Sequence, residues 1–206
     1  MSSRLQPIDI PDSIKQIDLG QTCERLIDTA NDRIESFMLS DQKVIPNFVT
    51  CDFHLLAQAL RWIDENHLCA GNRFMEWGSG FGVGVLLAAL NGKESVGIEI
   101  EQVLCDEASR LSDAVDVRAD FYCGSFVPHD VPGLLELSAE VKNVDTHEDD
   151  MYEYIGLEIE DFDLVFAFPW PGENGFFEAV FEACAADGAL LLTYRGREGM
   201  HLLRKG

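Results

Sequence analysis

Residues 73–91, RFMEWGSGFGVGVLLAALN, decide the fold of this chain. A short apolar run reaches an acid at Glu76, glycines then alternate from position 78 to position 84, and an apolar stretch follows at 85–90. This order predicts a strand, a glycine turn and a helix. Glycines permit positive φ and let the backbone approach a ligand, and the first turn of a helix leaves amide donors unpaired. We therefore expect a polar ligand at this turn.

The glycine spacing separates two kinds of ligand, because a dinucleotide-binding turn reads Gly-x-Gly-x-x-Gly. Here the last position of that pattern falls on a valine, whether the count starts at Gly78 or at Gly80. The turn instead reads Glu-x-Gly-x-Gly-x-Gly and begins at Glu76. A carboxylate at this point would repel a pyrophosphate and attract a cationic ligand. A glycine turn that only packs a helix onto a strand is the alternative interpretation.

A second acid stands at the end of the next predicted strand. Glu99 lies 23 residues after Glu76 and closes the strand-like run 95–98. A carboxylate about 20 residues beyond a glycine turn, at the tip of the next strand, accepts hydrogen bonds from the ribose hydroxyls of a bound nucleoside. In a chain this acidic, a solvated acid at a strand end is the alternative.

Together these two motifs resemble those of the class I S-adenosylmethionine-dependent methyltransferases, and the resemblance covers about residues 48–195. It implies a doubly wound, mostly parallel Rossmann-like α/β sheet, and S-adenosylmethionine as the cofactor, which carries an ammonium and a sulfonium. The resemblance also implies backbone contacts at the glycine turn, a carboxylate near the ammonium and another at the ribose. The cofactor-binding residues expected on this basis are Glu76, Gly78, Ser79, Gly80, Glu99, Ile100, Ser125, Phe126 and Phe168.

Two positions depart from the family pattern. After the third predicted strand, 115–123, the family often has an acid that accepts from the adenine amino group; Ser125 stands there, and Phe126 would stack on the ring. After the predicted buried strand 162–168, members that methylate amino nitrogens of bases or glutamine have Asn or Asp before Pro-Pro-aromatic. Phe168 occupies that polar position, so we do not expect this substrate class.

The ledge FPWPGE at 168–173 marks the expected acceptor side. Two prolines stiffen it, and it follows the carboxyl end of a parallel strand, where ligands bind in open α/β sheets. Trp170 would hold an apolar or cationic acceptor by stacking or cation–π contact, and Glu173 would orient or deprotonate it. We take these two as candidate catalytic residues for a small-molecule or protein acceptor. A ledge that only packs is the alternative.

Composition limits the expected partners and compartment. The chain has 206 residues, of which 47% are apolar, and 15 Lys and Arg against 37 Asp and Glu give a formal charge of −22. Such a field repels nucleic acid and anionic lipid, so we expect neither as a partner. The six cysteines lack zinc-site spacing, and we interpret them as small buried hydrophobic residues in a reducing compartment, with no bound metal. Without a signal-peptide core or a membrane-length apolar run, we expect a cytoplasmic protein.

The chain divides into an N-terminal part, 1–47, and a cofactor-binding domain, 48–206. Residues 1–20 read as a loosely held arm, and 22–38 have the apolar spacing of an amphipathic helix that flanks the domain. A second helix, capped by Thr50 or by Asp52, precedes the first strand.

The last third of the chain carries two further expectations. The acidic segment 143–161 contains HEDD at 147–150, which we interpret as a solvated loop rather than a metal site, because adjacent acids cannot all converge on one ion. Full members of the resembled family add an antiparallel hairpin after the fifth strand, but only one short strand, 200–203, has room here. The open edge would support a homodimer.

Two other functions stay open at this point. The chain would be a non-catalytic S-adenosylmethionine-binding or partner subunit if the departures at Ser125 and Phe168 remove the transferase activity. It would be a nicotinamide-dependent oxidoreductase if the turn held a dinucleotide, which the glycine spacing disfavours.

Overall fold

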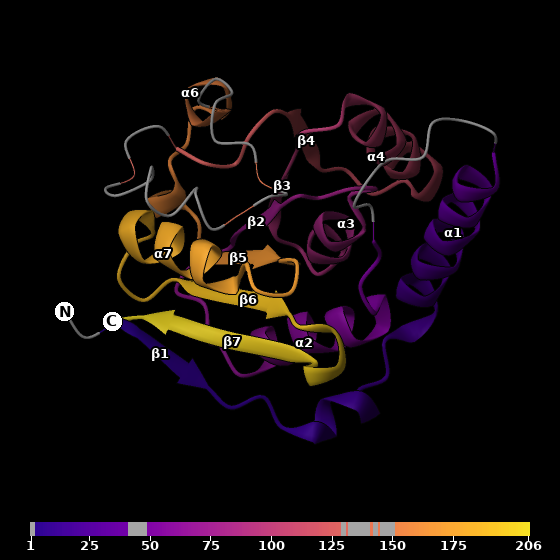
Figure 1. Cartoon of the computed structure of the whole chain (residues 1–206). Coiled ribbons are helices and arrows are strands. Elements are labelled where there is room, and N and C mark those ends of the chain that lie inside the picture. Colours follow the sequence, from indigo (N-terminus) through magenta and orange to yellow (C-terminus); the bar gives the residue numbers. More distant parts are fainter. Residues whose placement is uncertain (1–2, 41–48, 129–130, 132–140, 142–143, 145–150) are drawn as a thin grey trace.

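A computed structural model describes residues 3–40, 49–128, 131, 141, 144 and 151–206 of the protein (Figure 1). The solvated loop predicted at 147–150 lies outside the described residues, as does most of the acidic segment before it.

Within the described residues, seven strands form one sheet, in the order β1-β7-β6-β5-β2-β3-β4. Five of them run parallel and β7 runs antiparallel to β6, so the predicted doubly wound, mostly parallel sheet is confirmed. The central strand β2 pairs with β3 on one side and with β5 on the other, which makes it the point where the strand order reverses. The parallel strands are β2 (Arg73–Trp77), β3 (Glu94–Glu99), β4 (Asp120–Cys123), β5 (Leu164–Ala167) and β6 (Leu190–Tyr194).

The N-terminal residues are part of the sheet rather than a loose arm. β1 (Leu5–Ile8) pairs antiparallel with β7 (Met200–Lys205), and a 3-10 turn at Asp12–Gln16 follows it. A four-residue strand that contains Pro7 is too short for its alternation to be recognised in the sequence. Because β1 covers the edge of β7 that we expected to be open, the reason for a homodimer at that edge is removed.

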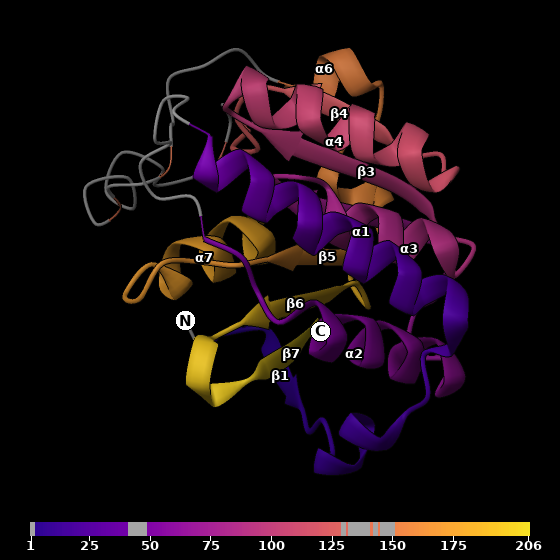
Figure 2. The same ribbon diagram turned by 90° about the vertical axis from the view of Figure 1, so that its right-hand side faces the viewer.

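Helices cover both faces of the sheet (Figures 1 and 2). In the first layer, α2 (Phe53–Glu65), α3 (Val83–Leu90) and α4 (Gln102–Val115) pack against one face, and α1 (Gly20–Leu39) packs on these three helices. The second layer packs α6 (Met151–Ile155) and α7 (Asn174–Cys184) against the other. None of the described helices has both the length and the apolar character needed to cross a membrane.

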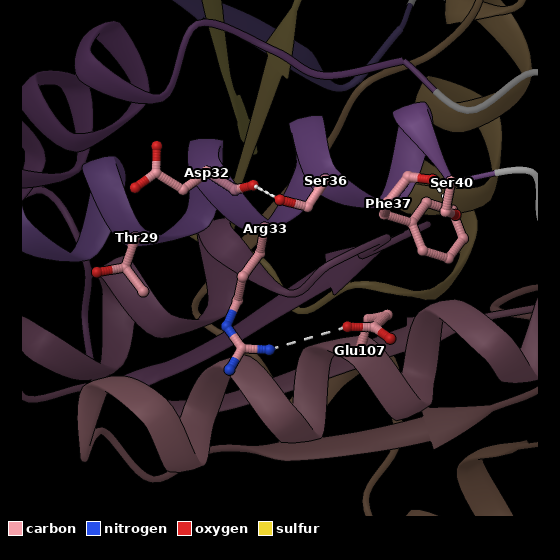
Figure 3. A pocket seen from close by; sticks show the side chains of 7 residues that line it. All are labelled: Thr29, Asp32, Arg33, Ser36, Phe37, Ser40 and Glu107. Atoms are coloured by element: carbon pink, nitrogen blue, oxygen red, sulfur yellow. Dashed lines mark hydrogen bonds and ion pairs between the residues drawn. The ribbon is translucent and has the colours of Figure 1, made fainter.

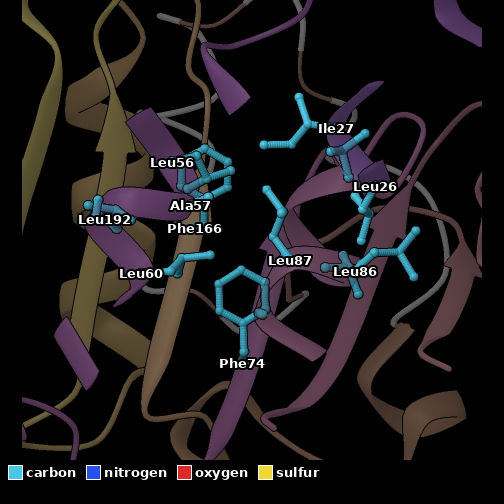
Figure 4. Close-up of a cluster of buried hydrophobic side chains, with 14 of the residues drawn as sticks. Leu26, Ile27, Leu56, Ala57, Leu60, Phe74, Leu86, Leu87, Phe166 and Leu192 are labelled. Carbon is cyan, nitrogen blue, oxygen red and sulfur yellow. The ribbon is translucent and has the colours of Figure 1, made fainter. Parts of the chain in front are cut away.

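The two core layers follow from the alternation of side chains along each strand. In β2, Phe74 belongs to the first layer, whereas Met75 and Trp77 belong to the second. Figure 4 shows the first layer, in which side chains of α1, α2 and α3 meet those of the strands. Because α1 contributes buried residues to the same cluster, it packs as an integral part of this core.

Two elements differ from the expectation. The third strand, predicted at 115–123, begins only at 120, because α4 continues to Val115 and Asp116 ends it in the left-handed conformation, with φ of 55°. The amide of Val117 then donates to Ser112 O at 3.2 Å. The apolar alternation that predicted a strand here reflects a helix end and a loop that pack against the first layer. The helix α6 lies in a segment where we expected no element.

Candidate functional site

The glycine turn lies at the carboxyl end of β2 and has the positive φ angles that favour glycine. Gly78, Gly80 and Gly82 have φ of 70°, 54° and 69°, and Gly82 is the residue on which α3 begins. A methyl group added at Gly78 would meet no atom within 4 Å, whereas at Gly82 it would lie 2.2 Å from the ring of Phe121. The turn is thus tightly packed where it enters the helix and open at its first glycine.

The amide groups of the turn are used within the protein. Gly78 N and Ser79 N both donate to Ile98 O, at 2.9 and 3.0 Å, and Gly80 N donates to Glu99 Oε2 at 2.8 Å. These three bonds hold the turn against the tip of β3. A ligand at the open first glycine would therefore meet carbonyl oxygens and Cα atoms rather than the amides of these residues.

Glu99 joins the strand tip to the glycine turn, so the structure brings the two sequence motifs together. The residue is 8% exposed; its Oε2 accepts from Gly80 N, and its Oε1 accepts from Glu101 N at 3.0 Å. Burial raises the pKa of Glu99, and the hydrogen bonds from backbone amides partly oppose that shift. A buried carboxylate held by two amides is fixed in direction, as a ligand-binding group needs to be.

Glu76 lies beneath the first turn of α3. Its Oε2 accepts from Val85 N at 2.9 Å, and burial raises its pKa to about 8. A methyl group added at Gly84 would lie 2.7 Å from Oε2, so the glycine makes room for the carboxyl group. Cys51, just before α2, is close enough for the charge of Glu76 to help raise the pKa of its thiol, after the larger effect of burial. The segment before α2 therefore lies near Glu76.

Gly97 supports the turn and was not recognised in the sequence. A methyl group on this residue in the middle of β3 would lie 2.8 Å from Ser79 Oγ and 2.9 Å from a methyl carbon of Val85. The glycine turn packs directly on β3 at this point. A glycine inside a strand is the signal that would have predicted such a close approach.

The residues expected at the adenine ring lie in different surroundings. Ile100 follows Glu99 at the strand tip and is 40% exposed. Ser125 is buried, and its Oγ accepts from Val127 N at 3.2 Å. Phe126 is 9% exposed and stacks on Trp77, with the ring centroids 4.9 Å apart. The structure places this ring in the second core layer, where Trp77 projects from β2, instead of presenting it at the surface.

Tyr152 of α6 holds Trp77 and Phe126 in place through hydrogen bonds, a role that the sequence did not predict. The indole nitrogen of Trp77 donates to Tyr152 Oη at 3.1 Å, and Tyr152 Oη donates to Phe126 O at 2.8 Å. The phenol is buried. Tyr152 is one of two tyrosines in the acidic segment 143–161, and no sequence pattern there would have predicted this role.

The expected acceptor side lies at the ends of β5 and β6. Phe168 is half-buried and packs edge-on against Tyr194, with the ring centroids 4.9 Å apart. Trp170 is half-buried, and Glu173, which is 7% exposed, donates its amide to Trp170 O at 2.9 Å. Burial raises the pKa of Tyr194, and the charge of Asp52 adds to the shift, so the start of α2 borders this region. Sequence reasoning did not single out Tyr194.

A separate groove runs between α1 and α4 (Figure 3). It has a volume of about 420 Å³, and Arg33 points across it toward Glu107, with 4.0 Å between Nη1 and Oε2. None of the predicted site residues lines it. The lining residues are Thr29, Asp32, Arg33, Ser36, Phe37, Ser40 and Glu107.

No protein-family model matches this sequence, and no curated protein matches it. Solved structures do resemble the fold. An O-methyltransferase from Bacillus cereus, solved with S-adenosylhomocysteine, has 14% identity and a TM-score of 0.50, over 87% of this chain and 69% of that protein. An RNA methyltransferase from Salinibacter ruber has 17% identity and a TM-score of 0.49, over 76% of this chain and 92% of that protein.

An S-adenosylmethionine-dependent methyltransferase from Clostridium acetobutylicum has 13% identity and a TM-score of 0.45, over 80% of this chain. The chain spans 56% of the length of that protein. At these identities the likeness is one of fold. The strand order and the likeness to the Bacillus cereus structure show that this chain has the fold of the class I S-adenosylmethionine-dependent methyltransferases.

Proposed function

We propose that this chain binds S-adenosylmethionine and transfers its methyl group to a small-molecule or protein acceptor. The observation that carries the proposal is Glu99, whose carboxylate is bonded to Gly80 N at the meeting point of the glycine turn and the β3 tip. A nucleoside that lies across this turn would place its ribose hydroxyls at Glu99. Ile100, exposed beside it, would contact the base.

The hydrogen bonds of the turn support a cationic ligand over a dinucleotide. A pyrophosphate needs free amide donors, but the amides of Gly78, Ser79 and Gly80 already donate within the protein. A primary ammonium is itself a donor and suits carbonyl oxygens, and the acid Glu76 lies behind the turn. This argues against the nicotinamide-dependent alternative on grounds independent of the glycine spacing.

The residues present fit this cofactor. The space at Gly78 has no atom within 4 Å of an added methyl group, so the turn leaves room for a ligand. Without a ligand, burial raises the pKa of Glu76 to about 8, and a bound ammonium would lower that pKa by favouring the charged carboxylate. Glu76 would then supply negative charge at the ammonium, and Glu99 would supply it at the ribose. Bound S-adenosylmethionine would supply a methyl group on a sulfonium, which is already a good leaving group. The protein would therefore mainly align the acceptor and exclude water.

For the acceptor we propose the region around the ledge after β5. Trp170 is half-buried there, Phe168 packs on Tyr194, and the buried Glu173 begins α7. An aromatic surface next to a carboxylate favours a flat, apolar or cationic acceptor. Trp170 would hold the acceptor, and Glu173 would orient it or take its proton.

A calorimetric titration of the whole chain with S-adenosylmethionine, S-adenosylhomocysteine and NAD tests the cofactor. We expect binding of both sulfur ligands and no binding of NAD. Tight NAD binding without a response to the sulfur ligands would remove the proposal. Binding of the sulfur ligands, without methyl transfer to a panel of amine, thiol, carboxylate and protein acceptors, would favour a non-catalytic binding subunit.

The Glu99→Ala variant tests the ribose contact. Because charge-assisted hydrogen bonds to hydroxyls are lost, we expect the affinity for S-adenosylhomocysteine to fall by roughly 1 to 3 kcal/mol. Glu94→Ala is the matched control, since Glu94 begins the same strand at the opposite end, with its side chain 72% exposed. Equal affinities of the two variants would reject the assignment of Glu99.

A further inference from the structure

Two cysteines that lie far apart in the sequence meet beside the strand tip that carries Glu99. Cys105 is in the first turn of α4 and is buried, and Cys123 is the last residue of β4 and is half-buried. Cys105 Sγ donates to Tyr122 O at 3.7 Å, and Tyr122 is the residue directly before Cys123, so the two cysteines are neighbours in space. β4 pairs with β3 in a register that sets Cys123 next to Glu99. The fold thus creates a thiol pair at the edge of the proposed cofactor site.

Both thiols donate hydrogen bonds to backbone carbonyl groups of the proposed cofactor-binding residues. Cys105 Sγ donates to Glu99 O at 3.4 Å, and Cys123 Sγ donates to Ile100 O at 3.5 Å. The amide of Cys105 also donates to Glu101 O at 3.2 Å, where α4 begins. Chemical modification of either sulfur would therefore alter a hydrogen bond to the segment from Glu99 to Glu101.

We propose that Cys105 and Cys123 form an oxidative modification site, in which a hydroperoxide converts the two thiols reversibly into a disulfide. Burial and the neighbouring Cys123 raise the pKa of Cys105, so Cys105 stays protonated and the more exposed sulfur reacts first. The sulfur of Cys123 attacks the peroxide, the O–O bond breaks, and a sulfenic acid and one water form. The sulfur of Cys105 then displaces the hydroxyl group as a second water. Two thiols lose two electrons, and one hydrogen peroxide becomes two waters.

The disulfide would disturb the strand tip for two reasons. Both S–H donors to the carbonyls of Glu99 and Ile100 disappear. The sulfur atoms also move to about 2.05 Å, well inside the separation of two sulfur atoms that are not covalently bonded, which pulls the start of α4 toward the end of β4. Because Glu101 O accepts the first hydrogen bonds of α4, the segment from Glu99 to Glu101 shifts with the start of that helix. On the proposed function, the oxidised protein would bind S-adenosylhomocysteine roughly two- to thirtyfold more weakly than the reduced protein.

The test treats the folded chain with hydrogen peroxide, unfolds it, counts the remaining thiols and maps the peptides by mass spectrometry. We expect a fall from six free thiols to four, a cross-linked peptide that joins positions 105 and 123, and full recovery with a reductant. Retention of six thiols, or a cross-link between any other pair, would overturn the proposal. None of these readouts involves a cofactor.

Two variants sharpen the result. Cys123→Ser keeps a hydroxyl donor for Ile100 O and should abolish the cross-link, whereas Cys184→Ser, which alters a half-buried cysteine at the end of α7, should leave it intact. Equal cross-linking in both variants would contradict the assignment.

The titration with S-adenosylhomocysteine is then repeated on reduced and oxidised protein. If the reduced protein does not bind, the proposed function fails while the thiol result stands. If both forms bind equally, the coupling to the cofactor site is wrong.

Discussion

Glu76 is an acid that the fold holds away from water, and this has a consequence for stability. Its pKa is raised by burial to about 8 from 4.5. Between these pH values the folded protein keeps a proton that the unfolded chain has released, so the free energy of unfolding falls as the pH rises. One group contributes a slope of at most about 1.4 kcal/mol per pH unit.

We expect Glu76→Gln to flatten this pH dependence. The amide cannot ionise, so the decline between pH 4.5 and 8 that Glu76 causes in the wild type disappears. Urea unfolding of both proteins at pH 5, 6, 7 and 8 measures the difference. Parallel curves for the two proteins would show that this carboxyl group ionises normally in the folded state.

Gly78 and Gly92 form a matched pair for the open space at the turn. Both have positive φ, of 70° and 87°, and an added methyl group at either meets nothing within 4 Å. Alanine at either position should therefore lower the free energy of unfolding by a similar amount, about 1 to 2 kcal/mol. Only Gly78→Ala should weaken S-adenosylhomocysteine binding, because Gly92 lies after α3, away from the turn. Equal affinities, measured by calorimetry, would mean that no ligand approaches Gly78.

At the scale of single residues, the spacing of the acids and glycines indicated which residues lie together, but nothing in the sequence indicated how the aromatic rings pack. Glu76, Glu99 and the glycines come together because their spacing is fixed by the strand–turn–helix unit. Phe126 follows a strand end, where an aromatic ring either faces a ligand or packs in the core. Phe126 packs in the core because its ring stacks on Trp77 and its carbonyl oxygen accepts from Tyr152 Oη. No local sequence pattern predicts these two contacts.

Among the elements, those with a continuous local signal were predicted well. α3 occupies 83–90 because an apolar run begins after Gly82 and ends before Asn91 and Gly92. The stretch 115–123 was misread because an apolar alternation also occurs where a helix end and a loop cover the core. β1 was missed because its partner, β7, is almost the whole chain length away, and pairing over such a distance leaves no local pattern.

The role of β1 can be tested by deleting residues 1–9. The deletion exposes the backbone donors and acceptors of β7, so we expect a lower melting temperature and more self-association than in the full chain. Thermal melting and light scattering with size-exclusion chromatography measure both. An unchanged melting temperature and an unchanged molar mass would show that β1 does not protect the edge.

In the whole molecule, the proposed site lies where the sheet reverses its strand order and where the two core layers meet. At the end of β2, Glu76 is turned toward α3 in the first layer, and Trp77 is turned into the second. Both layers therefore hold the strand end that carries the turn. The glycine turn and its two acids belong to consecutive elements, so the sequence could indicate that they lie together. The region around Phe168 depends on contacts between β5, β6 and α2, which lie far apart along the chain.

The central claim is that the glycine turn and Glu99 hold S-adenosylmethionine. A crystal structure of the chain grown with S-adenosylhomocysteine tests it most directly. We predict density across Gly78 to Gly80, with both ribose hydroxyls on the Glu99 carboxylate and the sulfur directed toward the Trp170 ledge. Density for the ligand at any other place on the protein, with the space at Gly78 still empty, would contradict the claim.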